Sequence, residues 1–157
     1  MSGQDDGLLD DTGFLLAHAS GVIVRMTNAR LAHLDLRVRH YSVLALVCDR
    51  DGLSQRDIAE FLGMDPSPVV SLIDTLEARS LVLRRPHPSD RRAREVRATP
   101  DGRAMRDRAR ADVAAARQDF LAKLTPDERG QLLTILRNLA LDGSDPGRPD
   151  RVAISDA

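Results

Sequence analysis

Three dipeptides in which a helix-capping residue precedes proline fix where helices of this chain can begin. They are Asp65-Pro66, Thr99-Pro100 and Thr125-Pro126. Asp and Thr side chains accept hydrogen bonds from the first helical turn, and proline at the first helical position lacks only an N–H group that would be unpaired anyway. Between the helix that starts at Pro66 and the helix that starts at Pro100, the chain contains a stretch without helical periodicity. The chain is therefore predicted to be mainly helical, with one short insertion of another kind.

Apolar residues at helical spacing predict six helices. These cover about residues 9–34, 41–48, 54–62, 66–79, 100–124 and 126–141. Ser54 with Asp57, and Thr125 with Glu128, have the spacing of capping boxes. Between the fourth and fifth helices, residues 81–83 and 94–99 favour two short strands around a Pro/Ser/Asp turn. The predicted fold class is mainly α with a small β-hairpin.

Positive charge gathers in this hairpin. Residues 84–97 contain six arginines against Asp90 and Glu95, an excess of four charges in a chain whose formal net charge is −1. Such a cluster favours a polyanionic partner. A helix-turn-helix can place its second helix in a DNA major groove while an arginine-bearing hairpin, the wing, reaches phosphates or the minor groove. Aromatic residues are scarce (3%), which argues against single-stranded nucleic acid. Residues 54–99 thus predict a winged helix-turn-helix for duplex DNA.

Residues 53–102 resemble the MarR (multiple antibiotic resistance regulator) family of transcription factors. The resemblance is most specific in the Asp-Arg-Arg of positions 90–92 and in the Val-x-x-Thr-x-x-Gly that begins at Val96, and it extends over roughly residues 9–141. It implies N- and C-terminal dimerisation helices. The expected division is a winged helix-turn-helix domain at 39–99, a helical dimerisation region at 9–38 and 100–141, a flexible acidic N-terminus at 1–8 and a flexible tail at 142–157.

The resemblance also implies a function. We expect a homodimeric, ligand-responsive transcriptional regulator, a repressor, that binds a pseudo-palindromic operator. Arg92 would enter the minor groove, and Asp90 would orient the wing arginines. The candidate DNA-binding residues are Ser54, Gln55, Ser67, Pro68, Val70, Ser71, Arg84, Arg85, Asp90, Arg91, Arg92 and Arg94. His33, His40 and Tyr41 are candidates for binding a small-molecule effector.

Two departures from the family pattern bear on DNA binding. Ser80 stands where relatives usually have a glycine after the recognition helix, and a left-handed serine there would cost roughly 1 kcal/mol. The outward positions of helix 66–79 carry short side chains, so base readout by that helix is expected to be limited. An alternative of another class is a winged-helix protein-interaction module with weak or no sequence-specific DNA binding.

Other functions find little support in the sequence. No phosphate loop, nucleophile motif or metal-spaced set of ligands occurs, so neither an enzyme, a cofactor nor a metal is expected. Cys48 lies on an apolar helical stripe and is expected to act as a small hydrophobic residue, with redox sensing as the alternative. No apolar run reaches the roughly 18 residues of a membrane span. The single cysteine excludes an intrachain disulfide, and a cytoplasmic location is expected.

Overall fold

The computed structural model describes residues 7–86 and 94–141. Of the predicted flexible ends, residues 1–6 and 142–157 lie outside the described residues. The helices are η1 (Leu8–Asp10), α1 (Thr12–Leu31), η2 (Ala32–Leu34), α2 (Val38–Asp49), α3 (Gln55–Leu62), α4 (Pro66–Ala78), α5 (Pro100–Phe120) and α6 (Pro126–Leu141). The strands are β1 (Leu53–Ser54), β2 (Val82–Pro86) and β3 (Arg94–Ala98). The predicted fold class, mainly α with a small β-hairpin wing, is confirmed.

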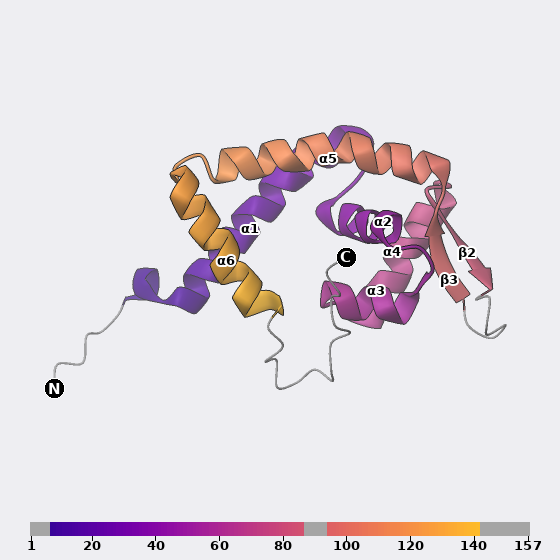
Figure 1. Cartoon of the computed structure of the whole chain (residues 1–157), viewed down its shortest axis with the longest axis horizontal. Coiled ribbons are helices and arrows are strands. Elements are labelled where there is room, and N and C mark those ends of the chain that lie inside the picture. The colour runs from indigo at the N-terminus through magenta and orange to yellow at the C-terminus, as the bar shows by residue number, and fades with distance from the viewer. Residues whose placement is uncertain (1–6, 87–93, 142–157) are drawn as a thin grey trace.

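The molecule has two parts joined by α5. Figure 1 shows α2, α3, α4 and the wing at one end, while α1 and α6 lie toward the other end beneath α5. Helix α5 packs along α1. An ion pair joins Arg30 of α1 to Asp119 of α5, and His33 of η2 lies 3.1 Å from the Asp112 carboxylate. Among the described residues, no helix has the length and apolar character that crossing a membrane requires.

The predicted helix caps at Ser54, Thr99 and Thr125 are confirmed, and the one at Asp65 is not. The Thr99 hydroxyl accepts from the Gly102 N–H at 2.9 Å, and the Ser54 and Thr125 capping boxes are both formed. Asp65 precedes α4 as predicted, but its side chain makes no capping hydrogen bond. Pro68 occupies the third helical position, which removes one of the two N–H groups that an N-cap side chain can bind.

The wing sheet has one strand more than the sequence predicts. Its order is β1-β3-β2, all antiparallel, with Leu53 opposite Val96 and Arg84 also opposite Val96 on the other side. The two residues of β1 lie directly before α3, so their pairing ties the start of that helix to the wing. The sequence-based prediction of two strands was incomplete here.

One hydrophobic core holds the winged helix-turn-helix together. It contains Val43, Leu44 and Val47 of α2, Ile58 of α3, Val69, Ile73 and Leu76 of α4, and Val82 and Val96 of the wing, all buried. Ser80 ends the turn after α4 with φ +58°, the left-handed conformation expected if serine replaces glycine there. The start of α5 packs tightly on this turn, because a Cβ atom on Gly102 would lie 1.9 Å from the carbonyl oxygen of Leu81.

Candidate DNA interface

Helices α3 and α4 form a helix-turn-helix whose second helix presents short side chains to solvent. Gly63 makes the turn with φ +66°. The inner face of α4 buries Val69, Ile73 and Leu76 in the core. The predicted contact residues Ser67, Pro68, Val70 and Ser71 all lie on its exposed face, in the first two turns. These turns offer two hydroxyl groups and apolar surface, which can meet base edges and thymine methyl groups.

The described part of the wing carries two exposed arginines near its tip. Arg85 pairs with Glu95 in the strand register, and Arg94 lies opposite Pro86. Both side chains are exposed, and neither forms an ion pair within the described part of the chain. The predicted contacts Asp90, Arg91 and Arg92 fall outside the described residues.

Arg84 is held differently from its neighbour Arg85. Its Nε donates to Gln55 of α3 at 2.9 Å, one terminal nitrogen donates to Asp74 of α4 at 2.5 Å, and the other donates to Glu77. Its backbone N–H also donates to Glu77, at 2.9 Å. Burial opposes the charge of the Arg84 side chain, but the hydrogen bonds to Asp74 and Glu77 outweigh it and raise the pKa of the guanidinium. We call these four residues the Arg84 cluster.

A second internal ion pair lies within strand β3 of the wing. Glu95 is buried, and its carboxylate accepts from Arg97 Nε at 2.5 Å. This pair raises the pKa of Arg97, which is also 4.0 Å from Asp51. Gly52 permits the arrangement, since its φ is +78° and a Cβ atom there would lie 2.8 Å from the Glu95 carboxylate. Because Arg97 is paired within the protein, its charge is less available to a partner than a charge count along residues 84–97 suggests.

The candidate effector residues occupy three different environments. His33 is exposed and lies 3.1 Å from Asp112. His40 is partly buried and accepts from the Arg37 backbone N–H at 3.3 Å. Its burial, together with nearby Arg79 and Arg37, lowers its pKa. Tyr41 is partly buried against the core.

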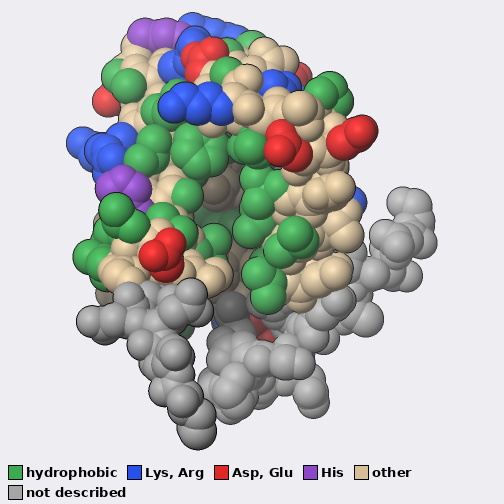
Figure 2. Space-filling model, turned by 90° about the vertical axis from the view of Figure 1, so that its left-hand side faces the viewer, with side chains coloured by type: hydrophobic (Ala, Val, Ile, Leu, Met, Phe, Trp, Pro, Cys, Tyr) green, Lys and Arg blue, Asp and Glu red, His purple; other side chains and the backbone are tan. Residues whose placement is uncertain are grey.

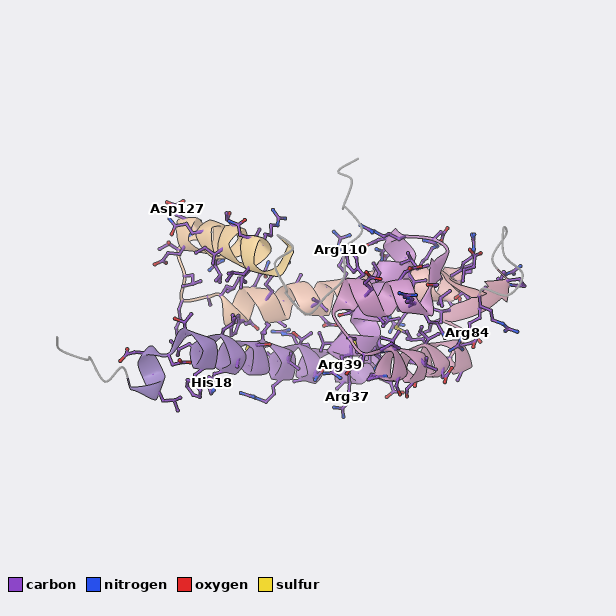
Figure 3. All side chains as sticks on the ribbon, turned by 90° about the horizontal axis from the view of Figure 1, so that it is seen from below. His18, Arg37, Arg39, Arg84, Arg110 and Asp127 are labelled. Carbon is purple, nitrogen blue, oxygen red and sulfur yellow. The ribbon has the colours of Figure 1, made fainter. Side chains whose placement is uncertain are left out.

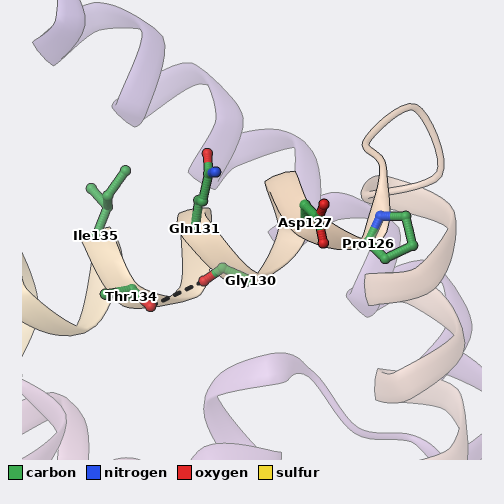
Figure 4. A pocket seen from close by; sticks show the side chains of 6 residues that line it. All are labelled: Pro126, Asp127, Gly130, Gln131, Thr134 and Ile135. Carbon is green, nitrogen blue, oxygen red and sulfur yellow. Dashed lines mark hydrogen bonds between the residues drawn. The ribbon is translucent and has the colours of Figure 1, made fainter.

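A shallow hollow of about 660 Å³ lies elsewhere, along α6 (Figure 4). It is lined by Pro126, Asp127, Gly130, Gln131, Thr134 and Ile135. All six residues belong to one helix, so this hollow does not involve the predicted effector residues. In the described part of the chain, no cluster of three or more His, Cys, Asp or Glu side chains is arranged to hold a metal ion.

Cys48 lies in the core of the DNA-binding part. It is 8% exposed, and burial is the main cause that raises the pKa of its thiol. Because the thiolate is the reactive form, this environment disfavours oxidation.

The sequence did not identify the residues that hold α4 in place through contacts with the α1–α2 connector and with β2. Arg79, just after α4, donates to the carbonyl oxygens of Leu34 at 3.0 Å and Asp35 at 2.6 Å. It thereby ties the end of the recognition helix to the connector between α1 and α2. Asp74 and Glu77 were likewise not identified, since only the folded chain brings β2 against α4.

Comparison with known proteins places this geometry in a family. The MarR family profile matches residues 36–93. An HTH-type transcriptional repressor of Mycobacterium tuberculosis is 30% identical over 138 residues, covering 87% of this chain and 99% of the relative. The chain belongs to the MarR family. Membership in this family of regulators confirms the expected non-enzymatic class.

Further known proteins are similar to this chain over different shares of its length. A relative from Thauera aromatica is 34% identical over 99 residues, which are 63% of this chain but only 60% of that protein. The structure of CouR from Rhodococcus jostii RHA1 bound to p-coumaroyl-CoA is 39% identical, with a TM-score of 0.79 over 96% of this chain and 100% of CouR. A transcriptional repressor also called CouR, solved bound to a 23-mer DNA duplex, is 33% identical, with a TM-score of 0.79 over 88% of this chain and 99% of that chain.

Proposed function

We propose that this MarR family protein is a homodimeric transcriptional repressor that binds a pseudo-palindromic operator and responds to a small-molecule effector. The observation that carries the proposal is the exposed start of α4 beside a ribbon with Arg85 and Arg94 at its end. This pair of elements suits insertion into a major groove with contacts to the adjacent backbone. The repressor called CouR that was solved on a 23-mer DNA duplex supports the same use of this fold. Acting on chromosomal DNA, the protein would work in the cytoplasm.

The homodimer is supported by an apolar surface that the single chain leaves uncovered. Figure 2 shows hydrophobic side chains on both sides of a hollow at the end of the molecule that carries α1 and α6. A single-chain protein rarely exposes so large a group of apolar residues without a partner. A second copy related by a two-fold axis would cover them and present two α4 helices about one DNA turn apart, ~10 bp. The exposed residues are Leu8, Leu9, Leu15, Leu16, Val24, Leu133, Ile135, Leu136 and Leu139.

The effector class that we propose is an aromatic acyl-CoA thioester. CouR, the 39% identical relative, was solved with p-coumaroyl-CoA. In this chain Arg37 and Arg39 are exposed next to the predicted effector residues His40 and Tyr41, and Figure 3 shows both arginines in the same region of the molecule. Guanidinium groups bind phosphates through charge-assisted hydrogen bonds, and coenzyme A carries several phosphates. To release the operator, the effector must bind the non-binding conformation more tightly.

The test begins with a duplex selected by the protein from a random-sequence library and measured by fluorescence anisotropy. We expect the logarithm of the association constant to fall steeply with the logarithm of salt concentration, by ~0.9 for each neutralised phosphate. We also expect p-coumaroyl-CoA to weaken binding more than free coenzyme A does. Failure to select any duplex, or a flat salt series, would contradict DNA binding. Stable association with another protein after nuclease treatment would then favour the interaction-module alternative.

A further inference from the structure

Arg84 connects three elements of the DNA-binding part through one side chain. It belongs to β2, Gln55 begins α3, and Asp74 and Glu77 lie in the second half of α4. Each of the three guanidinium nitrogens donates to a different side chain, and the planar fork of arginine suits such a divergent set of acceptors. The Arg84 cluster therefore sets the angle between the wing and the recognition helix.

The same contacts turn the Arg84 charge away from solvent. The side chain is 14% exposed, whereas Asp74 is 60% exposed and Glu77 39% exposed. To bind a phosphate, Arg84 would have to give up hydrogen bonds to two carboxylates that already neutralise it. Arg85 and Arg94, by contrast, are exposed without an ion pair in the described residues and can bind phosphate at no such cost.

Asp74 and Glu77 present an electrostatic problem for any helix that approaches DNA. Both are carboxylates on α4, and Asp74 is on its exposed side. Without a counter-charge they would repel the phosphates on either side of the groove. Arg84 lies against both and supplies that counter-charge from within the protein.

We propose that Arg84 is a positioning residue for operator binding, which neutralises Asp74 and Glu77 and fixes the wing against α4 without itself contacting DNA. This inference rests on the proposed function. It differs from the expectation drawn from the sequence, in which Arg84 was a candidate DNA-binding residue like Arg85 and Arg94. The two roles predict different coupling between Arg84 and the two carboxylates.

The experiment is a double-mutant cycle read by fluorescence anisotropy on the selected duplex. Arg84→Ala is compared in the wild-type background and in an Asp74→Asn/Glu77→Gln background, each over a series of salt concentrations. We expect a loss of affinity of about tenfold in the wild-type background and of no more than about threefold in the neutralised background, because the cost comes mainly from the uncompensated carboxylates. In the neutralised background the salt slope should be unchanged by Arg84→Ala, because no phosphate contact is removed.

Arg85→Ala is the matched control, since Arg85 is the next residue of β2 and has an exposed side chain. It should weaken binding equally in both backgrounds and reduce the salt slope by ~0.9. If Arg84→Ala behaves in the same way as this control, the inference is overturned. Should Arg84→Ala not fold, Arg84→Gln removes the same charge while keeping a polar side chain, and it is read by the same criteria.

The wild-type measurement distinguishes a failure of the proposed function from a failure of the positioning role of Arg84. Absence of DNA binding by the wild-type protein would overturn the proposed function, and the positioning role with it. Wild-type binding together with an additive cycle would overturn the positioning role alone.

Discussion

Gly102 is the glycine, among those that the structure describes, at which an added methyl group would meet the closest contact. It lies in the first turn of α5, and a Cβ atom there would be 1.9 Å from the Leu81 carbonyl oxygen, 2.9 Å from the Leu81 carbonyl carbon and 3.4 Å from Leu44 Cδ1. A carbon and an oxygen normally approach no closer than about 3.3 Å. Gly102→Ala must therefore move two backbone segments apart by about 1.4 Å. Neither segment is a flexible side-chain end that could simply rotate away.

The expected magnitude follows from what this movement breaks. Overpacking of this kind costs about 1–3 kcal/mol. The same carbonyl accepts from the Thr99 N–H at 3.1 Å, and loss of that hydrogen bond costs about 1 kcal/mol more. The higher helix propensity of alanine returns up to ~1 kcal/mol. We expect Gly102→Ala to lower the free energy of unfolding by about 3 kcal/mol, a value at the upper end of overpacking effects.

Urea unfolding followed by circular dichroism measures this change, at one fixed protein concentration because a dimer's stability depends on it. Gly130→Ala is the matched control, since Gly130 is also helical and a Cβ atom there meets nothing within 4 Å. That variant should be as stable as the wild type or more stable, by up to ~1 kcal/mol. Equal stability of the Gly102→Ala and Gly130→Ala variants would refute the close approach of α5 to the Leu81 turn.

Three further predictions concern other parts of the chain. Leu136→Asp combined with Leu139→Asp should convert the protein to a monomer, because both side chains lie on the apolar surface proposed to be covered by the second copy. Multi-angle light scattering measures this change, and a persistent dimer would point to another interface. Peroxide should leave operator binding of the wild type unchanged and equal to that of Cys48→Ala, since burial raises the pKa of the Cys48 thiol; a peroxide effect that this variant abolishes would contradict this. The pKa of His40 is lowered in the folded protein by burial and by Arg79 and Arg37, so the unfolded state binds the proton more readily. The free energy of unfolding should therefore fall as pH drops through and below the ordinary histidine pKa of about 6.5. His40→Gln should reduce this loss, and an unchanged pH dependence in that variant would show that another group is responsible.

Features encoded by neighbouring residues could be predicted from the sequence. Thr99-Pro100 and Thr125-Pro126 marked the starts of α5 and α6, because capping is a matter of three or four consecutive residues. The pairing of β1 with β3 was missed because Leu53-Ser54 is too short for a strand pattern and pairs with Val96 and Glu95, some forty residues later. The cap at Asp65 did not form, and the consequence of Pro68 for the donor at that position was not drawn from the sequence.

The DNA interface shows the same division between local and distant information. The exposed face of α4, with Ser67 and Ser71, followed from helical spacing alone. The different environments of Arg84 and Arg85 could not be predicted in this way. Adjacent residues of a strand point to opposite faces, and only the packing of β2 on α4 decides which of the two arginines contacts Asp74 and Glu77. Counting charges along a segment therefore overestimates how many of them are available to a partner.

The order β1-β3-β2 leaves β2 on the outer edge of the wing sheet. An edge strand offers unpaired backbone groups on which the strand of another molecule could add, and proteins commonly prevent this with charged residues and proline. Strand β2 ends in Arg84-Arg85-Pro86, so its outer end combines the exposed charge of Arg85 with a proline that has no N–H to donate. When the protein is away from DNA, these residues should discourage strand-to-strand aggregation between wings, which gives the cationic edge a second use in keeping the unbound regulator in solution.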